Sequence, residues 1–350
     1  MNELTRKLQA GLDLTPSDVA YAVTLLLQDG GDDVAKAEFL TALHQKGESA
    51  DEISGFVEQL IERAVDPMID PQNLSGPVID VCGTGGDGLH MFNVSTTIMF
   101  ILAAGGAVVV KHGNRSVTSR CGSADVLEAL GVPISLAPDA LKDCVERLGF
   151  GFIYARQYHP AFRAIAGMRE RLAREKTRTI FNLVGPLLNP VRPARQLLGV
   201  FAPRLTTIFA DVLLRLGRER AWVVCGLTES GEPMDDISTA GPTTLGELVD
   251  GKISTAVIDT AWLGVEPSTL ADLRGGDATE NAALLTGILD GSVRGAKRDL
   301  ALVNAAAGFV VAGLADDLRV GIQRASEQLD SGRALEKLRA LQSYGENVSR

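Results

Sequence analysis

Apolar positions in the first half of the chain fall into short runs that are separated by glycine-rich or polar turns. The runs at 78–82 and 107–111 predict two buried strands, and a capped apolar segment at about 95–104 predicts a helix between them. This order is typical of a βαβ unit with polar loops at 83–88 and 112–123. Because ligands bind at the carboxyl ends of strands in open α/β sheets, we expect both loops to line a site.

Residues 1 to about 70 show only helical periodicity. A helix start at Thr15-Pro16-Ser17-Asp18 and a capping box at Ser49-Ala50-Asp51-Glu52 each precede apolar residues at helical spacing. This segment carries no candidate chemistry. We therefore expect a small helical domain that could provide a dimer surface.

Alternating strand and helix patterns resume after residue 150. The predicted elements are strands at 151–155, 197–201 and 222–225, a helix at 204–216, a hairpin turning at Asp250-Gly251, and helices after Asp277. The turn-rich segment 181–193 predicts a crossing between domains. The predicted class is α/β, with a small N-terminal helical domain and a larger α/β domain built on a central, mainly parallel sheet.

We expect the helical domain to span residues 1–72 and to be joined by part of 170–195. The α/β catalytic domain is then expected to consist of residues 76–168 and 196–345.

Composition and charge narrow the class of protein. The chain has 350 residues, of which 45% are hydrophobic and 22% charged, as in soluble globular proteins. Its net charge of −10 argues against sequence-independent binding to nucleic acid or to anionic membranes. Scattered cysteines and the polar residues 1–10 predict a cytoplasmic protein without a secretory signal. The longest apolar stretch, 97–110, is too short for a membrane span.

The loop Gly83-Thr84-Gly85-Gly86-Asp87 predicts an anion site, because glycines let backbone N–H groups approach a ligand closely. A helix then begins, and its N-terminal N–H groups and dipole favour phosphate. Cap-type side chains and cations gather around this edge, at Asn93, Ser95, Thr96, Lys111, Arg115 and Arg120. The pattern predicts a phosphate-rich small molecule as ligand.

Other interpretations of the glycine loop fit less well. Residues 83–88 satisfy G-x-G-x-x-G, but a dinucleotide site has an acidic residue at the end of the next strand, where this chain has Lys111-His112. No Gly-Lys-Ser/Thr follows the glycines, which excludes the nucleoside triphosphate P-loop. A glycine turn without a ligand is disfavoured because the neighbouring loop has the same polar bias.

A helix led by His159-Pro160 is predicted to carry an arginine on its apolar stripe. Arg169 shares that stripe with Phe162 and Ile165. A buried charge must be paired or must face a ligand, since an unpaired one is very unfavourable. The pattern leaves a structural ion pair and a ligand contact equally open.

Adjacent carboxylates, Asp235-Asp236, lie in the loop 228–238 after a predicted strand. Carboxylates at this edge can hold Mg²⁺, a hard cation that keeps waters and shares ligand phosphates. Two solvated acids without a role are the alternative, and the pattern by itself favours that alternative.

These motifs together resemble the anthranilate phosphoribosyltransferase family. The resemblance is carried by GTGGD, FNVSTT, KHGNRSVTS and GSADVLEALGV, and it continues through TRTIFNLVGPLLNP, LRGGDATENAALL and LVNAAAGFVVAG to ALEKLRAL. It implies a fold of the nucleoside phosphorylase or phosphoribosyltransferase type. It also implies transfer of phosphoribosyl from phosphoribosyl pyrophosphate to anthranilate in tryptophan biosynthesis, with Mg²⁺ as cofactor and a homodimer formed through the helical domain.

The resemblance also implies roles for individual residues. The implied phosphoribosyl pyrophosphate contacts are Gly83, Gly86, Asp87, Asn93, Val94, Ser95, Thr96, Lys111, Ser119 and Ser123. The implied anthranilate contacts are Gly83, His112, Asn114 and Arg169, and the implied metal ligands are Ser95, Asp235 and Asp236. No catalytic residue is assigned, although His112 is a candidate to accept the amine proton.

The sequence departs from the family pattern at three places. Asp236 stands where the family usually has glutamate, which moves the carboxylate back by about one C–C bond. Met91 replaces a threonine hydroxyl near the glycine loop, and about three extra residues lie between Arg169 and Arg178.

Two other functions are alternatives. One is a transferase of the same fold that acts on another aromatic or pyrimidine acceptor, such as a pyrimidine nucleoside phosphorylase. The other is a weakly catalytic paralogue that binds nucleic acid, which the net charge of −10 disfavours.

Overall fold

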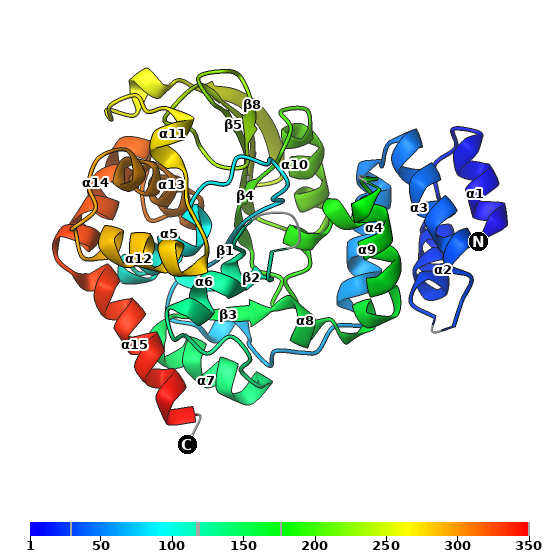
Figure 1. The fold of residues 1–350 in the computed structure, drawn as a ribbon, viewed down its shortest axis with the longest axis horizontal. Helices are drawn as coiled ribbons and strands as arrows, with labels where there is room; N and C mark the ends of the chain where they lie inside the picture. Colours follow the sequence, from blue (N-terminus) through cyan, green and yellow to red (C-terminus); the bar gives the residue numbers. More distant parts are fainter. Residues whose placement is uncertain (29, 117–119, 176, 349–350) are drawn as a thin grey trace.

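The computed structural model describes residues 1–28, 30–116, 120–175 and 177–348. Its N-terminal helices are α1 (Asn2–Gln9), α2 (Pro16–Leu26), α3 (Asp33–Lys46) and α4 (Ala50–Ile61). The predicted capping box at Ser49 starts α4, and α2 begins at the predicted helix start, where Thr15 also forms a capping box. Figure 1 shows these helices gathered at one end of the molecule, beside α9 (Ala166–Arg174).

The larger part of the chain is organised on a sheet, and the described residues form eight strands of it in the order β3-β2-β1-β4-β5-β7-β8, with β6 paired to β5. The strands are β1 (Val78–Gly83), β2 (Val108–Gly113), β3 (Phe150–Tyr154), β4 (Arg195–Gly199), β5 (Arg220–Leu227), β6 (Pro233–Met234), β7 (Thr243–Val249) and β8 (Lys252–Ile258). Strands β1 to β5 pair in parallel, whereas β6, β7 and β8 are antiparallel additions. The mainly parallel sheet predicted from the sequence is confirmed.

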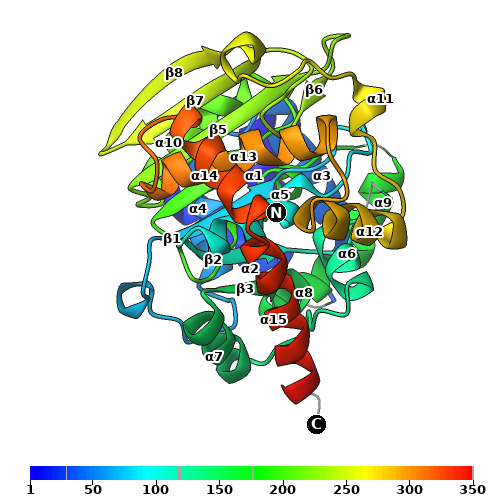
Figure 2. The same cartoon turned by 90° about the vertical axis from the view of Figure 1, so that its left-hand side faces the viewer.

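Helices cover both faces of the sheet (Figures 1 and 2). The longer ones are α5 (Val94–Ala104), α6 (Ser123–Ala129), α7 (Pro138–Leu148), α10 (Leu205–Arg215), α12 (Ala278–Leu289), α13 (Ala296–Ala312), α14 (Leu318–Asp330) and α15 (Arg333–Val348). The short ones are α8 (Ala155–Tyr158), α11 (Leu270–Leu273) and the 3-10 turns η1 (Pro71–Asn73), η2 (Pro160–Ile165), η3 (Ile180–Asn182), η4 (Gly185–Leu187) and η5 (Thr260–Trp262).

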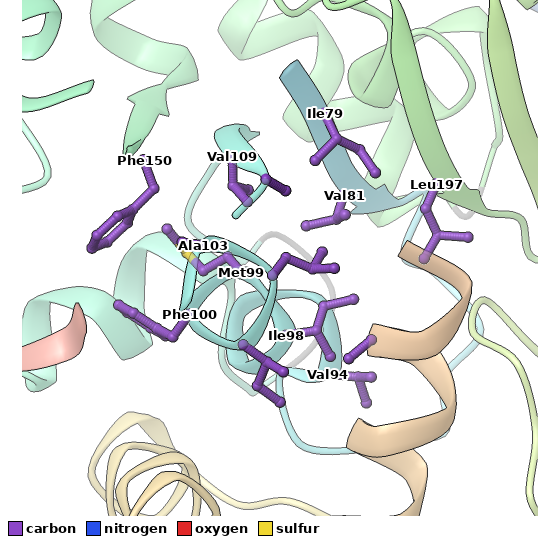
Figure 3. Close-up of a cluster of buried hydrophobic side chains, with 14 of the residues drawn as sticks. Ile79, Val81, Val94, Ile98, Met99, Phe100, Ala103, Val109, Phe150 and Leu197 are labelled. Carbon is purple, nitrogen blue, oxygen red and sulfur yellow. The ribbon is translucent and has the colours of Figure 1, made fainter. Parts of the chain in front are cut away.

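Helix α5 is surrounded by apolar side chains of the core. Figure 3 shows Ile98, Met99 and Phe100 of this helix among side chains of the neighbouring strands, including Val81 and Val109. All five side chains are almost completely removed from solvent. A helix that is apolar all round has to be enclosed, so the N-terminus of α5 is held rigidly against the ends of β1 and β2.

Alternating strand residues belong to two separate apolar clusters. In β5, Trp222 and Val224 join the cluster around α5, whereas Val223 and Cys225 join a second cluster. That second cluster is continuous with the N-terminal helices and with apolar side chains of 165–188. We therefore propose that part of 170–195 packs with the helical domain, as the predicted domain division requires. The division itself, at 72 and 76, stays a prediction.

The structure corrects several predicted boundaries. The second polar loop was predicted to begin at His112, but β2 continues to Gly113 and includes Lys111 and His112. The helix led by His159-Pro160 starts as the 3-10 turn η2, and α-helical geometry begins only at Ala166. The hairpin is confirmed, because Asp250 and Gly251 have φ values of 50° and 76°, as a tight two-residue turn requires.

No helix within the described residues is both long and apolar enough to cross a bilayer.

Candidate functional site

The glycine loop leaves β1 at Gly83 and lies against the loop that holds the two adjacent aspartates. Gly85 and Gly86 have φ values of 65° and 78°, a conformation that side chains other than glycine rarely adopt. The backbone N–H of Gly85 donates to Asp235 Oδ2 at 2.7 Å. A Cβ atom on Gly83 would lie 2.3 Å from the same oxygen, so this approach requires a glycine. The predicted phosphate loop and the predicted metal ligand therefore meet directly.

Asn93 stands at the N-cap position of α5, but its side chain does not cap the helix as the sequence suggested. Its Nδ2 donates to the carbonyl oxygen of Cys121 at 3.2 Å, and its Oδ1 accepts from Asn281 Nδ2 at 3.0 Å. The first turn of α5 consequently has no side-chain cap from the described residues. The N–H of Val94 donates to the carbonyl oxygen of Phe92 at 2.8 Å, so the N–H groups of Ser95 and Thr96 are the ones that can receive an anion. The buried hydroxyl of Thr96, in that turn, has no hydrogen-bond partner among the described residues.

Lys111 is buried beside this helix start. Its Nζ donates to the carbonyl oxygen of Val81 and, at 3.1 Å, to the hydroxyl of Ser95. Burial lowers the pKa of Lys111, while acidic groups around it, Asp236 among them, oppose the shift. The ammonium thus compensates part of the negative charge of the site and orients Ser95.

The aspartate pair lines a small pocket together with Ser95, so the three predicted metal ligands are brought together. Burial, and secondarily the Asp87 carboxylate, raise the pKa of Asp235 to about 7. Burial together with Asp235 and Asp87 raises the pKa of Asp236 well above its ordinary value. Both side chains are partly buried, which argues against the alternative of freely solvated loop acids.

An oxygen-donor set of this kind fits a hard cation. Within the described ranges, no group of three or more His, Cys, Asp or Glu side chains is arranged to hold a metal. Mg²⁺ characteristically binds through one or two carboxylates and completes its shell with waters and substrate phosphates. Two crowded carboxylates beside an anion-binding loop suit a cation that binds together with a phosphate ligand.

Arg169 lies beside a pair of contacting aromatic rings rather than in an ion pair. Its guanidinium carbon is 5.6 Å from the ring centroid of Phe162 and 5.2 Å from that of Phe181. Burial lowers the pKa of Arg169, and no carboxylate within the described part of the chain forms a salt bridge with it. The alternative of a structural ion pair is therefore not supported, which leaves a ligand contact as the remaining interpretation from the sequence.

A row of aromatic rings connects Arg169 to the end of β2. Ring centroids are 5.3 Å apart between His112 and His159, 5.8 Å between His159 and Phe162, and 5.7 Å between Phe162 and Phe181, all with edge-to-face geometry. Burial lowers the pKa of His112 well below its ordinary value, with His159 and Lys111 adding to the shift. His112 is therefore a neutral imidazole near pH 7, and its Nε2 has no partner among the described residues.

Not all polar residues of the second polar loop, 112–123, face the site as the sequence predicted. Asn114 is exposed, and Ser123 Oγ donates to its carbonyl oxygen at 3.3 Å. Arg115 was expected to add positive charge to the site, but it pairs with Asp125 and Glu128 instead. Arg120 is exposed, and Ser119 lies outside the described residues.

Several residues that organise the site were not singled out from the sequence. Asn304 accepts the N–H of Ile237 at 2.9 Å and donates to its carbonyl at 3.0 Å, which fixes the backbone directly after Asp236. Arg178 donates to the carbonyl of Gly86 at 3.2 Å and stacks over Phe201. The only signal that could have found them was their place in the LVNAAAG and TRTIFN motifs.

Comparison with known proteins gives consistent results over the whole chain. Residues 75–335 match a family model described as "Glycosyl transferase family, a/b domain", and residues 2–64 match one described as "Glycosyl transferase family, helical bundle domain". The chain is 44% identical over 335 residues to the anthranilate phosphoribosyltransferase of Anaeromyxobacter dehalogenans strain 2CP-1, with 96% of each sequence covered. It is 43% identical over 342 residues to the protein of the same name from Moorella thermoacetica, with 97% of each covered.

Solved structures show the same fold. The crystal structure of anthranilate phosphoribosyltransferase from Thermus thermophilus superimposes with a TM-score of 0.88 at 36% identity, covering 98% of this chain and 99% of that one. Anthranilate phosphoribosyltransferase from Saccharomyces cerevisiae in complex with PRPP and Mg superimposes with a TM-score of 0.85 at 24% identity, covering 99% of this chain and 97% of that one.

Proposed function

The chain belongs to the anthranilate phosphoribosyltransferase family, and on that premise we propose that it transfers the phosphoribosyl group of phosphoribosyl pyrophosphate to anthranilate. The products are N-(5-phosphoribosyl)anthranilate and pyrophosphate, as in tryptophan biosynthesis. The bond from ribose C1 to the pyrophosphate oxygen breaks, the bond from C1 to the amine nitrogen forms, and the amine loses one proton.

We assign the donor to the edge formed by the glycine loop and the start of α5. Backbone N–H groups of Gly83 and Gly86, with those of Ser95 and Thr96, would bind its phosphates, and the buried ammonium of Lys111 would add positive charge. Val94, the other predicted contact in this turn, would contribute by its position only, because its N–H donates to the carbonyl oxygen of Phe92. The remaining predicted donor contacts are Asp87, Asn93, Ser119 and Ser123. Asn93 would act chiefly by holding the loops, because both polar atoms of its side chain are already bonded.

We propose Asp235, Asp236 and Ser95 as the Mg²⁺ ligands, because they line one pocket and their carboxylates crowd each other. A bound Mg²⁺ supplies charge neutralisation to the departing diphosphate. The chain's own part is to hold Asp235 in place through Gly85 and to hold the residue after Asp236 through Asn304. The shorter side chain of Asp236 can still reach a cation through a water molecule.

The observation that carries the choice of acceptor is the position of Arg169 beside the contacting rings of Phe162 and Phe181, without a salt bridge to any described residue. Anthranilate is an aromatic ring with an ortho carboxylate and amine, so it needs a cation for the carboxylate and aromatic surface for the ring. The aromatic row supplies that surface from Phe181 to His112, which lies at the sheet edge that holds the donor loop. Asn114 and Gly83 would complete the acceptor site at the same edge.

Proximity supplies much of the rate acceleration, which in favourable cases is worth about 7–11 kcal/mol. An aromatic amine is weakly basic, and its nitrogen becomes acidic once it has bonded to C1. A neutral imidazole with an unpartnered nitrogen is suited to accept that proton, and we propose His112 Nε2 for this step.

A product assay tests the proposed function. Purified protein would be supplied with phosphoribosyl pyrophosphate and Mg²⁺ and with anthranilate, 4-aminobenzoate, aniline or uracil in separate reactions. We expect product with anthranilate and a far lower rate with 4-aminobenzoate or aniline, because these displace or lack the ortho carboxylate. Turnover of uracil in place of anthranilate would establish the pyrimidine alternative and refute the proposal.

We further propose a homodimer formed through residues 1 to about 70. Support comes from large apolar side chains exposed on or beside these helices, Leu12, Tyr21 and Val34, each more than half accessible. Sedimentation equilibrium at micromolar concentration would give twice the monomer mass, and Tyr21→Glu would lower it. A monomer would refute the dimer without affecting the catalytic proposal. A cytoplasmic location stays a prediction.

A further inference from the structure

A buried carboxylate lies beneath the acceptor side of the site and takes no part in the chemistry proposed above. Asp80, in the middle of β1, is completely inaccessible to solvent, and so is Asn189. Asp80 Oδ1 accepts the backbone N–H of His112 at 3.3 Å, and its Oδ2 accepts from Asn189 Nδ2 at 3.0 Å. The same Nδ2 also donates to the carbonyl oxygen of Val110 at 2.7 Å. One carboxylate thus connects β1, β2 and residues 185–191, which lie within the turn-rich segment 181–193 and are called the crossing segment below.

That crossing segment in turn holds the two imidazoles of the aromatic row. His159 Nε2 lies 2.8 Å from the carbonyl oxygen of Leu188, so this nitrogen must carry the proton and donate it. The backbone of Gly185 in the same segment lies close enough to the His112 ring to oppose the lowering of its pKa, and His112 Nε2 has no partner in the described structure. The segment therefore sets the tautomer of His159 and adjoins the ring of His112.

We propose that Asp80, acting with Asn189, is a positioning residue for the acceptor site. It fastens the segment 185–191 to β1 and β2, and this segment aligns His112 and His159 for the incoming aromatic amine. Asp80 does not touch a substrate. This inference rests on the proposed function, since it concerns the geometry of the acceptor half of that site.

The position of Asp80 predicts an asymmetric effect on the two substrates. Its hydrogen bonds lead to β2 and to the segment 185–191, and its charge acts on Lys111, whereas the aspartate pair is held by Gly85 and Asn304. Asp80→Asn keeps the size of the side chain but turns one acceptor into a donor, which would face the amide donor of Asn189. The segment would then shift relative to His112, and the donor loop would remain in place.

The test measures KM for each substrate and kcat in matched variants of the full-length protein. For Asn189→Ala, which keeps the Asp80 carboxylate, we expect the anthranilate KM to rise at least tenfold and kcat to fall, with the phosphoribosyl pyrophosphate KM and the Mg²⁺ requirement changed less than twofold. Asp80→Asn should raise the anthranilate KM as much, and because it also removes a charge that acts on Lys111, the phosphoribosyl pyrophosphate KM should rise too, but by less. Asn304 is an equally buried amide on the metal side. Asn304→Ala should therefore raise the phosphoribosyl pyrophosphate KM and the Mg²⁺ requirement and leave the anthranilate KM nearly unchanged. Gln328→Ala, a buried polar residue of α14 remote from both, controls for lost stability and should leave both KM values unchanged.

The outcomes separate this inference from the proposed function. If wild-type protein does not use anthranilate, the proposed function fails. If wild-type protein does, but Asp80→Asn raises both KM values equally or lowers only the melting temperature, the positioning role is refuted and the function stands. If Asp80→Asn does not fold, Asn189→Ala decides by the same criteria, because it removes the hydrogen bond from the Asn189 amide and keeps the Asp80 carboxylate.

Discussion

Arg169 provides the sharpest test of acceptor recognition, through the substitution Arg169→Ala. The guanidinium lies within 5.6 Å of two ring centroids and is desolvated without a salt-bridge partner among the described residues. A charge-assisted hydrogen bond to the anthranilate carboxylate is worth about 1.5–3 kcal/mol. At about 1.4 kcal/mol per factor of ten, its loss should raise the anthranilate KM about ten- to 150-fold. The KM for phosphoribosyl pyrophosphate should stay within twofold.

The stability of the Arg169→Ala variant should change little, because two opposing effects are removed together. Cation–π contacts of a desolvated guanidinium with Phe162 and Phe181 contribute about 2 kcal/mol, and the desolvation of an unpaired charge offsets them. Steady-state kinetics with each substrate varied in turn, alongside thermal unfolding, measures both quantities. An unfolding free energy within about 1 kcal/mol of wild type, combined with the large KM effect, is the expected result.

Two variants make this experiment decisive. Arg169→Lys keeps the charge but cannot bind a carboxylate through two parallel N–H groups, so its KM should lie between those of wild type and Arg169→Ala. Arg171→Ala removes an exposed arginine of the same helix, which pairs with Glu175 at 3.9 Å, and should leave both KM values unchanged. Equal increases in both KM values for Arg169→Ala, or a similar acceptor effect for Arg171→Ala, would contradict the assignment.

Three further predictions concern the metal side. Asp236→Asn should lower activity and raise the Mg²⁺ concentration needed, whereas Asp236→Glu should be tolerated; unchanged Mg²⁺ dependence in both Asp235→Asn and Asp236→Asn would eliminate the metal site. The folded-state pKa of Asp235 is raised to about 7, so ionisation of this group destabilises the metal-free protein as pH rises from about 4 to 7. Mg²⁺ binds the ionised carboxylate, so it should raise the melting temperature progressively more between pH 6 and pH 8. Its binding should be about tenfold weaker at pH 6 than at pH 8. A pH-independent Mg²⁺ effect would contradict this. Gly83→Ala should raise the Mg²⁺ requirement because its Cβ would lie 2.3 Å from Asp235 Oδ2, whereas Gly167→Ala, which meets nothing within 4 Å, should not.

Much of the fold could be predicted because it depends on local signals. Capping boxes at Thr15 and Ser49, the tight turn at Asp250-Gly251 and the apolar runs around the glycine loop involve neighbours in the sequence, and the structure contains each of them. The start of the helix after His159 was wrong for a related reason. Helical spacing of apolar residues does not distinguish a 3-10 turn from the first turn of an α-helix, and Pro160 to Ile165 adopts the former.

Side-chain roles were harder to predict where the partner is distant or competes locally. Asn93 was expected to cap its own helix, but its oxygen is taken by Asn281, 188 residues away. Arg115 was expected to serve the site, but Asp125 and Glu128 on the next helix neutralise it. A sequence pattern shows which groups a residue could bond, and only the folded arrangement decides which partner is reached first.

The aspartate pair shows how far a local pattern can be misleading about environment. From the sequence alone, Asp235-Asp236 in a loop is most simply a solvated pair, because nothing nearby in the chain removes it from water. In the structure the loop is surrounded by groups from four distant segments. These are Gly83 and Gly85 at the end of β1 and just beyond it, Gly199 at the end of β4, Lys111 in β2, and Asn304 in α13. A Cβ atom on Gly199 would lie 1.5 Å from the carbonyl oxygen of Asp235, so the parallel strands themselves bring this loop against the phosphate loop. Burial then raises the pKa of both carboxyls, and two crowded acids become a site whose ionised form requires a cation.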